Sequence, residues 1–399
     1  MDRPHMSDAA RMIEDRGGAE RFSLLGGPLH RLGRRLGLVR GATNTTAMGV
    51  AIGVFLWFVL LALATIERVG HVAFSLALAG THVRLLLVIP LCFLCESLVD
   101  PRMDAFVGTI ARSGVVPEKA LPALNSVILR TRRWKDSVWP DALCLLAAAL
   151  WSMSGLHGAL PGMSATFDPS HTVAGAGISR SWYWIVCLPL FRFLIMRWMW
   201  RLGIWWYFLA RVAWLELRLV PTHPDGAGGL GFLEVVHAHF LPLIVAISAV
   251  QAASFAEEFV TGEIAFETIY PTLISVVLVN IMLFVGPLLL FSRKLWTCKV
   301  DGLMEYMEFA ESYVRGFDTK WLRTGPGPTE PLLGTSDLQS LADLGNSVSV
   351  VRRMRWAPVS LIAVRDITLA ALVPIAPLLL LKYPIAELAQ RFVSRLAGL

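Results

Sequence analysis

The sequence predicts an all-α protein that crosses a membrane about seven times, within limits of six and eight spans. Three observations support this fold class. Hydrophobic residues make up 55% of the 399 residues and charged residues only 17%, whereas soluble domains carry roughly 25% charged residues. Apolar runs of about 20 residues, the length that a helix needs to cross a bilayer, recur along the chain. Tryptophan gathers near the ends of these runs, as in interfacial aromatic belts.

Residues 1–46 contain eight arginines and no lysine. They are polar and lack the short apolar run and cleavage site of a secretory signal. We therefore expect a cytoplasmic, Arg-rich arm, followed by an integral membrane domain over residues 47–399. The predicted spans of that domain are Ala47–Ile66, Val83–Val99, Val138–Leu156, Ser181–Trp200, Glu234–Phe255, Ile269–Phe291 and Asp366–Leu381.

Polar segments between the spans also carry helical patterns. In residues 100–136, apolar residues recur at helical spacing, which predicts amphipathic helices on the membrane surface. Residues 293–356 predict two cytoplasmic helices, Leu303–Val314 and one from Asp337 towards Arg353, separated by a linker at Gly325–Pro331.

Two elements near the membrane boundary are less regular. Leu202–Val220 is apolar but charged in places, so it is either an interfacial helix or a continuation of span four into the cytoplasm. Pro374 and Pro377 interrupt the short last span, and an amphipathic helix is predicted after it at Ile385–Leu396.

The distribution of basic residues predicts the orientation. Of the 36 lysines and arginines, 27 lie in residues 1–46, 100–136, 201–234 and 293–356, and only Arg68 and Arg180 lie in the opposite loops. Basic residues accumulate on the cytoplasmic side, so we expect a cytoplasmic N-terminus in a bacterial inner membrane. Seven spans would place the basic C-terminal tail outside, so its side stays open.

Arginines within the fourth span and its extension are the first candidate site: Arg192, Arg197, Arg201 and Arg211. Charges in the hydrocarbon layer usually face a partner or water, so these residues indicate an ion path or a gating element. Snorkelling to the inner boundary is the alternative for Arg197 and Arg201. Arg192 is deepest, and Glu96 is its candidate partner. Asn280 in span six could line the same path or bond a neighbouring helix.

The loop PTHPDGAGGLGFL at Pro221–Leu233 is the second candidate. Its glycines match G-x-G-x-x-G, but no strand precedes them and no Walker lysine follows, so a nucleotide site is not predicted. One interpretation is a sharp connection that needs positive φ at glycine. The other is an ion site that uses backbone N–H groups together with His223, Asp225, Gly228 and Gly229.

Charged residues near two other span ends complete the candidates. Glu257, Glu258, Glu263 and Glu267 follow span five without a basic residue among them. They form either an acidic outer mouth that attracts cations or a solvated loop. Arg365 and Asp366 begin the last span and could join a polar network or pair with neighbouring helices.

No metal, cofactor or catalytic centre is predicted. His237 and His239 are two residues apart, which places them on opposite faces of a helix. Cys92 and Cys95 lie in an apolar stretch and are expected to be buried. No Ser–His–Asp order, H-E-x-x-H motif or paired carboxylates stand out, so nothing positive indicates an enzyme.

Two stretches carry a family resemblance. Arg218–Leu233, with HPDGAGGLGFL, and Gly334–Arg353, with SLADLGNS, resemble signatures of an uncharacterised family of polytopic bacterial inner-membrane proteins. Together they cover about a tenth of the chain. The resemblance implies membrane class and bacterial origin and carries no activity or functional residue with it.

These features favour a channel-like or transporter-like protein for a small ion or solute. The alternative is a non-transporting scaffold or sensor that docks a partner through its cytoplasmic helices. The expected partners are the lipid bilayer, further copies of the chain and a cytoplasmic protein. Nucleic acid is not expected, because orientation accounts for the net charge of +6.

Overall fold

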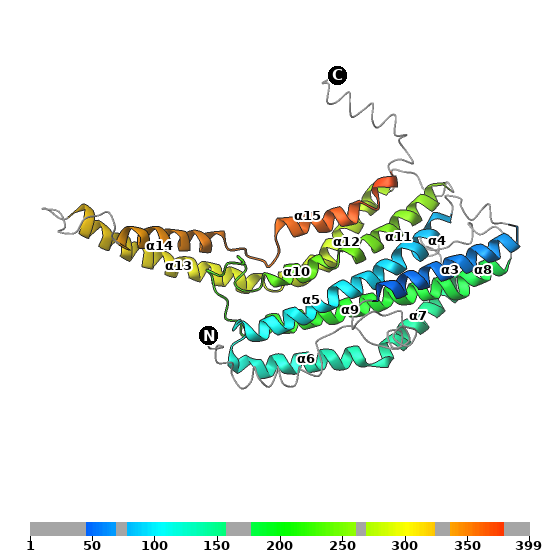
Figure 1. Cartoon of the computed structure of the whole chain (residues 1–399), viewed down its shortest axis with the longest axis horizontal. Coiled ribbons are helices and arrows are strands. Elements are labelled where there is room, and N and C mark those ends of the chain that lie inside the picture. The colour runs from blue at the N-terminus through cyan, green and yellow to red at the C-terminus, as the bar shows by residue number, and fades with distance from the viewer. Residues whose placement is uncertain (1–44, 69–77, 157–176, 261–268, 324–335, 379–399) are drawn as a thin grey trace, which may run out of the picture.

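The computed structural model describes residues 45–68, 78–156, 177–260, 269–323 and 336–378. Every regular element within these ranges is a helix, which confirms the all-α class. Most of the helices run side by side along the longest axis of the molecule (Figure 1). One pair, α13 (Ser292–Phe317) and α14 (Ser336–Arg353), projects beyond the others at one end.

Three helices are long and apolar enough to cross a bilayer: α3 (Thr46–Ile66), the continuous helix Ala79–Arg112, and Phe232–Val260. They match the first, second and fifth predicted spans. Leu273–Leu289 and Ser292–Leu322, bent by 49° at their junction, add a fourth if they count as one broken span. Length and composition therefore identify three or four spans in the described residues and do not confirm the predicted seven.

The remaining predicted spans are helical but shorter or more polar. α7 (Val138–Leu156) has 19 residues, of which Val138–Met153 is an apolar helix shorter than the three full spans. The last predicted span begins within α15 (Leu361–Leu372), whose 12 residues reach about 18 Å, less than the hydrocarbon thickness of roughly 30 Å. It ends two residues before Pro374. Residues 379–399, including the predicted C-terminal helix, lie outside the described residues, as does the arm at 1–44.

Two unusually long helices form the centre of the bundle. The first joins α4 (Ala79–His82), η3 (Val83–Val88) and α5 (Ile89–Arg112). The second joins α8 (Ile178–Trp182), η6 (Tyr183–Cys187) and α9 (Leu188–Trp214) and contains the fourth predicted span. α5 packs on α3 and on α10 (Phe232–Ala238) and α11 (Leu241–Val260). α9 packs on α6, α7 and α12 (Ile269–Leu289), and the two long helices contact each other.

The amphipathic segment at residues 100–136 differs from its prediction. Residues 100–112 complete α5, and only α6 (Leu121–Asp136) is a separate helix. α6 has the expected apolar face, but this face packs against α9 and is buried inside the protein. α9 continues to Trp214 without interruption, so residues 202–214 extend the fourth predicted span.

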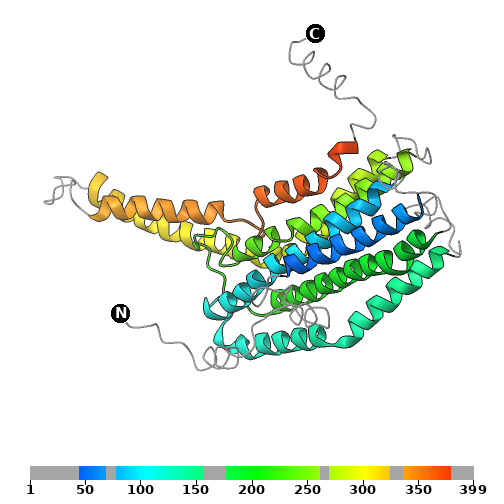
Figure 2. The same ribbon diagram turned by 45° about the vertical axis from the view of Figure 1, so that its right-hand side comes forward.

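The predicted cytoplasmic helices at residues 293–356 form one long helical hairpin. α13 continues as η8 (Asp318–Leu322), and α14 returns along it (Figure 2). Lys320 Nζ binds Asp337 Oδ2 at 2.8 Å and Tyr313 donates to the Asp337 carbonyl at 3.1 Å, which fixes the distal end of the pair. Only Leu295, Gly302 and Val351 are buried along α13 and α14. The linker Gly325–Pro331 lies outside the described residues.

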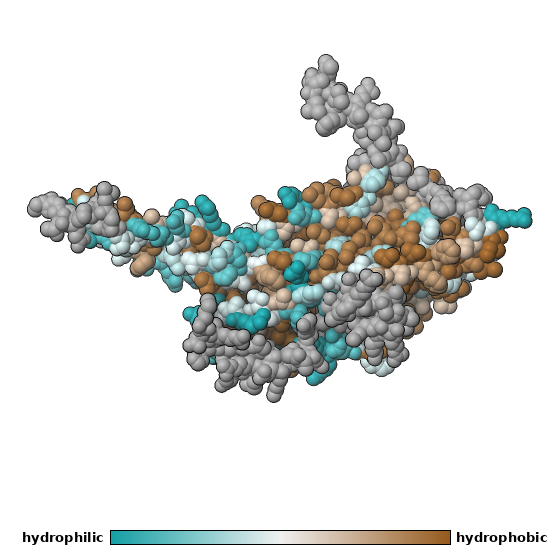
Figure 3. Space-filling view, viewed as in Figure 1, coloured by the Kyte–Doolittle hydropathy of each residue, from teal (hydrophilic) through white to brown (hydrophobic). Residues whose placement is uncertain are grey.

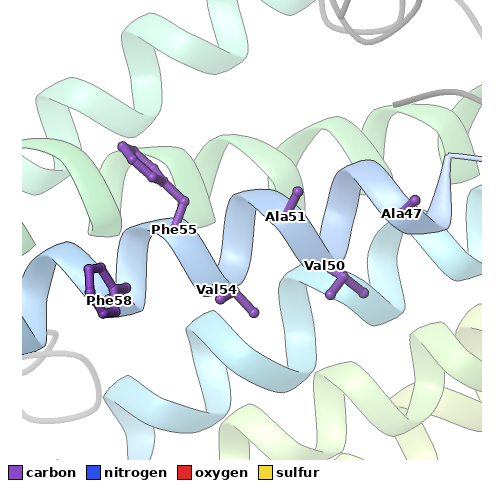
Figure 4. Close-up of a pocket in the computed structure, with 6 residues that line it drawn as sticks. All are labelled: Ala47, Val50, Ala51, Val54, Phe55 and Phe58. Carbon is purple, nitrogen blue, oxygen red and sulfur yellow. The ribbon is translucent and has the colours of Figure 1, made fainter. Parts of the chain in front are cut away.

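The surface separates into an apolar and a polar part. Hydrophobic residues gather over the bundle, whereas the hairpin is largely hydrophilic (Figure 3). One side of α3 shows this apolar surface at close range, because Ala47, Val50, Ala51, Val54, Phe55 and Phe58 line a shallow open groove (Figure 4). This distribution is typical of a bundle that faces lipid over part of its length.

The opposite side of α3 packs closely on the helix that contains η3 and α5. A Cβ atom at Gly49 would lie 2.6 Å from Phe93 Cβ, and one at Gly53 would overlap the Leu85 carbonyl oxygen. The Thr45 hydroxyl donates to the Phe93 carbonyl at 3.0 Å. Small residues at such contacts let helix backbones approach closely within a membrane.

Substituting Gly53 therefore tests this packing. We expect Gly53→Val to destabilise the bundle by about 1–3 kcal/mol, because the added side chain has no space. Ala51→Val is the matched control, since Ala51 lies on the exposed side of the same helix. Both are measured by SDS-induced unfolding in mixed micelles, and equal stability of the two variants would contradict the packing described.

Candidate functional site

Three arginines of α9 are buried inside the bundle. Arg192, Arg197 and Arg201 are 5%, 5% and 6% exposed. A snorkelling side chain keeps its charged end in water, so that interpretation is wrong for Arg197 and Arg201. Each of the three guanidinium groups instead meets a partner on a neighbouring helix.

The Arg201 guanidinium forms an ion pair with Glu96 on α5. Nη2 of Arg201 lies 2.8 Å from Oε1 of Glu96, and both side chains are buried. The guanidinium also lies over the Trp198 ring, 5.6 Å from its centroid, a cation–π geometry. Asp100 is buried one turn further along α5. The sequence suggested Glu96 as the partner of Arg192, but the structure pairs it with Arg201.

Arg197 pairs with Asp141, which sequence reasoning missed. Nε of Arg197 lies 3.5 Å from Oδ1 of Asp141, in the first turn of α7. A signal was present, because Asp141 is the one charged residue within the apolar stretch Val138–Leu156. Placing it opposite Arg197 required the rotation of α7 against α9, which sequence periodicity does not give.

Arg192 lies one and a half turns closer to the other end of α9. Its Nη1 donates to Ser152 Oγ at 3.0 Å, and the guanidinium lies 4.6 Å from the centroid of the Trp151 ring. A cavity of about 230 Å³ opens beside it between α7, α9 and α11. Most of the lining is apolar, and Arg192 and Gln251 supply the polar groups.

A second buried cluster surrounds Arg84 in η3. Its Nη1 donates to Tyr183 Oη at 2.9 Å and its Nη2 to Ser254 Oγ at 3.3 Å. Glu257 Oε2 lies 3.6 Å from Nη2. Arg84 therefore links the two central helices to α11. The sequence placed Arg84 at the edge of span two and predicted no role for it.

Both partners of the Arg84–Tyr183 hydrogen bond lie in π-helical turns. Arg84 belongs to η3, and Tyr183 is the first residue of η6. Single π-helical turns within α-helices are rare and occur frequently at functional sites. Two such turns that meet through a buried charge therefore make this region part of the candidate site.

Carboxylates lie at the first turns of both central helices. Glu257 Oε1 accepts the Gly80 N–H at 2.7 Å, and Glu67 accepts N–H groups from Ile178 and Ser179. A negative charge near a helix N-terminus compensates unpaired N–H groups and the helix dipole. The two contacts hold the starts of both helices at the same end of the bundle.

The predicted acidic mouth is described only in part. Glu257 turns inward towards Arg84 and Gly80 and is largely buried. Glu258 follows it on α11, and its Oε1 is also buried. Glu263 and Glu267 lie outside the described residues. The described half of this group thus contributes to the bundle interior, and the mouth stays a prediction.

The loop at Pro221–Leu233 folds around Asp225. Its carboxylate accepts N–H groups from Ala227 at 2.8 Å, Gly229 at 3.1 Å and Gly231 at 2.7 Å. The ring Nδ1 of His223 lies 2.8 Å from Oδ1 of Asp225. The N–H groups that a bound anion would use are therefore directed at the protein's own carboxylate.

Glycine at two loop positions is required by geometry. Gly228 and Gly229 adopt φ of +64° and +99°, which confirms the predicted need for positive φ. A Cβ at Gly229 would also lie 2.7 Å from Val115, beyond the end of α5. The loop thus packs against the end of a central helix.

Burial and hydrogen bonds act in opposite directions on Asp225. Partial burial raises the pKa of its carboxyl, whereas the N–H bonds from Ala227, Gly231 and Gly229 lower it by more. The pKa therefore lies below its ordinary value. The ionised carboxylate is the form that holds the loop together.

Arg355 joins the loop to the segment after α14. The Arg355 side chain donates through Nη2 to the Asp225 carbonyl at 2.9 Å and pairs through Nη1 with Glu234 at 2.5 Å. The backbone N–H of Arg355 donates to the Gly226 carbonyl at 2.8 Å. Glu234 also accepts the hydroxyl of Ser360, which caps α15. One arginine thus connects the loop with the starts of α10 and α15.

His237 is buried between α9 and α12. Trp205 Nε1 donates to its Nε2 at 3.1 Å, and its Nδ1 donates to the Phe284 carbonyl at 2.6 Å. Both ring nitrogens are therefore used by a neutral imidazole. His239 lies on a different face, where its ring Nδ1 donates to the Val235 carbonyl four residues earlier. The predicted separation of the two histidines onto different faces is confirmed.

The other predicted polar positions are not part of the buried cluster on α9. Asn280 is buried, and its Nδ2 donates to the Val276 carbonyl of its own helix at 2.8 Å. Within the described residues its Oδ1 accepts no hydrogen bond. Arg365 pairs with the adjacent Asp366 at 2.8 Å on an exposed side of α15. Neither Asn280 nor Arg365 therefore lies beside Arg192 in the structure.

Within the described ranges, no group of three or more His, Cys, Asp or Glu side chains is placed to hold a metal ion. Comparison of the chain with protein-family models, with curated proteins and with solved structures finds no match. Its function must therefore be inferred from the geometry of the molecule itself.

The Arg201–Glu96 pair yields a testable double-mutant cycle. We expect Glu96→Gln to destabilise the bundle by about 3–5 kcal/mol, because it leaves a buried guanidinium without its carboxylate. Glu96→Gln combined with Arg201→Met should recover part of that loss. SDS-induced unfolding of the single and double variants measures the coupling free energy.

Glu311→Gln is the control for this cycle, because the Glu311–Arg315 pair on α13 is exposed. Exposed pairs contribute about 0–1 kcal/mol. Additive effects of the two substitutions at Glu96 and Arg201 would show that the buried pair is not coupled.

The Asp225 carboxylate predicts a pH dependence of stability. A carboxyl whose pKa is lowered by folding stabilises the protein fully above its ordinary value of about 3.9. That stabilisation is lost as the pH falls from there through the lowered pKa. We expect Asp225→Asn to be less stable than the natural chain at pH 7 by about 1–3 kcal/mol, and the difference to shrink below pH 4.

Thermal unfolding at a series of pH values measures this difference. Asp343→Asn, at an exposed position of α14, controls for removal of one negative charge. A stability difference for Asp225→Asn that stays constant from pH 7 to pH 2 would contradict the role given to the carboxylate.

Proposed function

We propose that this chain is a multi-pass protein of a bacterial inner membrane that moves a small ion or solute along α9. The proposal rests mainly on a series of buried polar side chains along the helix formed by η6 and α9. Tyr183, Arg192, Arg197 and Arg201 lie along one helix, and the 18 residue steps from the first to the last correspond to about 27 Å. That length is close to the roughly 30 Å hydrocarbon thickness of a bilayer.

Buried ion pairs are weak contributors to stability, because desolvation offsets most of their attraction. Charged residues inside membrane segments accordingly mark ion or substrate paths in many proteins. Arg197 with Asp141 and Arg201 with Glu96 provide paired charges near one end of the series. A transported ion could take the place of one charged side chain in a pair. The remaining side chain would then still face an opposite charge.

Arg192 and its cavity favour an anion as the transported species. The guanidinium borders the space between α7, α9 and α11, so an occupant of that space meets a positive charge. On the same side, Nη1 of Arg192 donates to the neutral hydroxyl of Ser152 at 3.0 Å. The apolar remainder of the lining would strengthen the electrostatic attraction by excluding water.

The contacts at the two ends of the bundle support the proposed seven-span topology with a cytoplasmic N-terminus. Val115, Leu295 and Arg355 come from segments predicted to be cytoplasmic, and all three meet the loop at residues 221–233. At the other end Glu67 meets Ser179, and Glu257 meets Gly80. Segments predicted on the same side of the membrane thus lie together.

Flux measurements on purified chain in proteoliposomes test the proposal. We expect passage of small anions such as chloride or nitrate, reduced at least tenfold by Arg192→Leu because the guanidinium beside the cavity is lost. Arg211→Leu is the matched control, since Arg211 lies on the same helix but is exposed. Absence of flux for a panel of anions and cations, or equal flux in the two variants, would reject it.

A second candidate function is a membrane scaffold or sensor that docks a cytoplasmic protein. The projecting α13–α14 hairpin favours it, because this pair extends beyond the bundle and few of its residues are buried (Figure 1). The two functions do not exclude each other, since a docked protein could control transport.

A further inference from the structure

An apolar stripe runs along the outer face of α13. Trp296, Met304, Met307 and Val314 are 58%, 63%, 53% and 41% exposed. On an α-helix these positions lie within an arc of about 80°. Large apolar side chains aligned on one face and left exposed mark an interaction site more often than scattered ones do. These four residues form the α13 stripe.

The α13 stripe is not the surface on which the hairpin closes. α14 packs against a different face of α13, where Tyr313 donates to the Asp337 carbonyl and Trp321 Nε1 donates to the Asp337 carboxylate. Tyr313 and Trp321 are partly buried there. α13 therefore has two apolar faces, one used by α14 and one unpartnered among the described residues.

Acidic residues border the middle of the stripe, around Met304 and Met307, whereas basic residues lie near its two ends, at Lys299 and Arg315. Between Asp301 and Val314 the chain carries four carboxylates and neither lysine nor arginine. The carboxylates are those of Asp301, Glu305, Glu308 and Glu311. Arg315, one residue further on, pairs with Glu311. The surface around Met304 and Met307 is therefore apolar with a negative border.

The apolar stripe and its acidic border together indicate which kind of partner could bind there. A second copy docked through the same stripe would bring like-charged borders together, which is unfavourable. An anionic lipid surface attracts basic segments and repels acidic ones. A nucleic acid is repelled for the same reason. A cationic, amphipathic partner satisfies both the apolar stripe and the negative border.

We propose that the α13 stripe binds a basic amphipathic helix of a soluble protein. This inference rests on the second candidate function, docking of a partner, and is independent of ion transport. Methionine side chains adapt to varied apolar partners, and a helix laid along another helix matches apolar residues at three- and four-residue spacing. The carboxylates would steer the approach and set the orientation of the basic side chains.

The base of the hairpin connects this stripe to the bundle. Lys299 Nζ donates to the Met354 carbonyl at 2.7 Å, and Lys294 Nζ donates to the Leu215 carbonyl just after α9. A Cβ at Gly228 would meet both Met354 and Leu295, so the loop lies directly against the base. A helix bound to the stripe therefore sits on a segment attached to the end of α9.

Peptide binding to the full chain in nanodiscs of neutral phosphatidylcholine tests the proposal. The probe is an 18-residue helix of leucine and lysine with apolar residues at heptad spacing. Its controls are a scrambled peptide of the same composition and a peptide with glutamate in place of lysine. We expect the basic amphipathic peptide to bind, with an affinity that falls as salt rises, and the two control peptides to bind at least tenfold more weakly.

Variants of the chain locate the binding. Met304→Gln with Met307→Gln should weaken binding at least tenfold, and Glu305→Gln with Glu308→Gln should weaken it and reduce its salt dependence. Leu338→Gln is the matched control, because Leu338 is an exposed apolar residue of α14 and should leave binding unchanged. All these side chains are exposed, so thermal unfolding should not change.

Three results would overturn the proposal. The first is equal binding of the basic and acidic peptides. The second is unchanged binding to the Met304→Gln, Met307→Gln variant. The third is a fall in the oligomeric mass of the chain caused by that variant, measured by sedimentation, because it would assign the stripe to a second copy. None of these results depends on flux, so failure here and failure of transport are distinguishable.

Discussion

A guanidinium group inside an apolar helix bundle needs opposite charge or hydrogen-bond acceptors close by, and α9 places three such groups in the interior. Removing a charge from water without compensation costs several kcal/mol. Glu96 therefore has to face Arg201 and Asp141 has to face Arg197. These two contacts fix the rotation and register of α5 and α7 against α9. The same requirement at the other end, where Arg84 meets Tyr183 and Glu257, fixes α11 against both central helices.

The loop at Pro221–Leu233 provides the complementary constraint at the opposite end. Asp225 collects three backbone N–H groups and thereby determines the course of the chain between α9 and α10. Arg355 then attaches the segment that connects α14 with α15. The two prominent features of the molecule, the buried charges of α9 and the projecting hairpin, are consequently joined through one short loop. A change at the hairpin base would be transmitted first to this loop and to the end of α9.

Most helices could be predicted from the sequence, because an apolar run or a helical spacing is a local property. α3, the helix at Phe232–Val260 and the apolar face of α6 were all expected. The predicted count of seven spans is not confirmed, since length and composition identify three or four spans in the described residues and α15 has only 12 residues. For the site, the arginines were identified as candidates, yet Asp141, Tyr183 and Ser254 were missed. A carboxylate or hydroxyl within a span gives no local indication of the helix that it will face.

The sequence by itself determined the all-α class, the apolar character of the bundle, the presence of arginines within an apolar helix and the glycines of the loop. Each follows from the residues of one segment, because hydropathy, charge and backbone freedom act locally. The tertiary structure alone decided that Glu96 pairs with Arg201, that α6 packs on α9, that Asp225 occupies the N–H groups of its own loop and that one face of α13 stays exposed. These outcomes join residues distant in the chain or depend on which face of a helix is covered. They are set by the rotation and register that the packing of the whole bundle imposes.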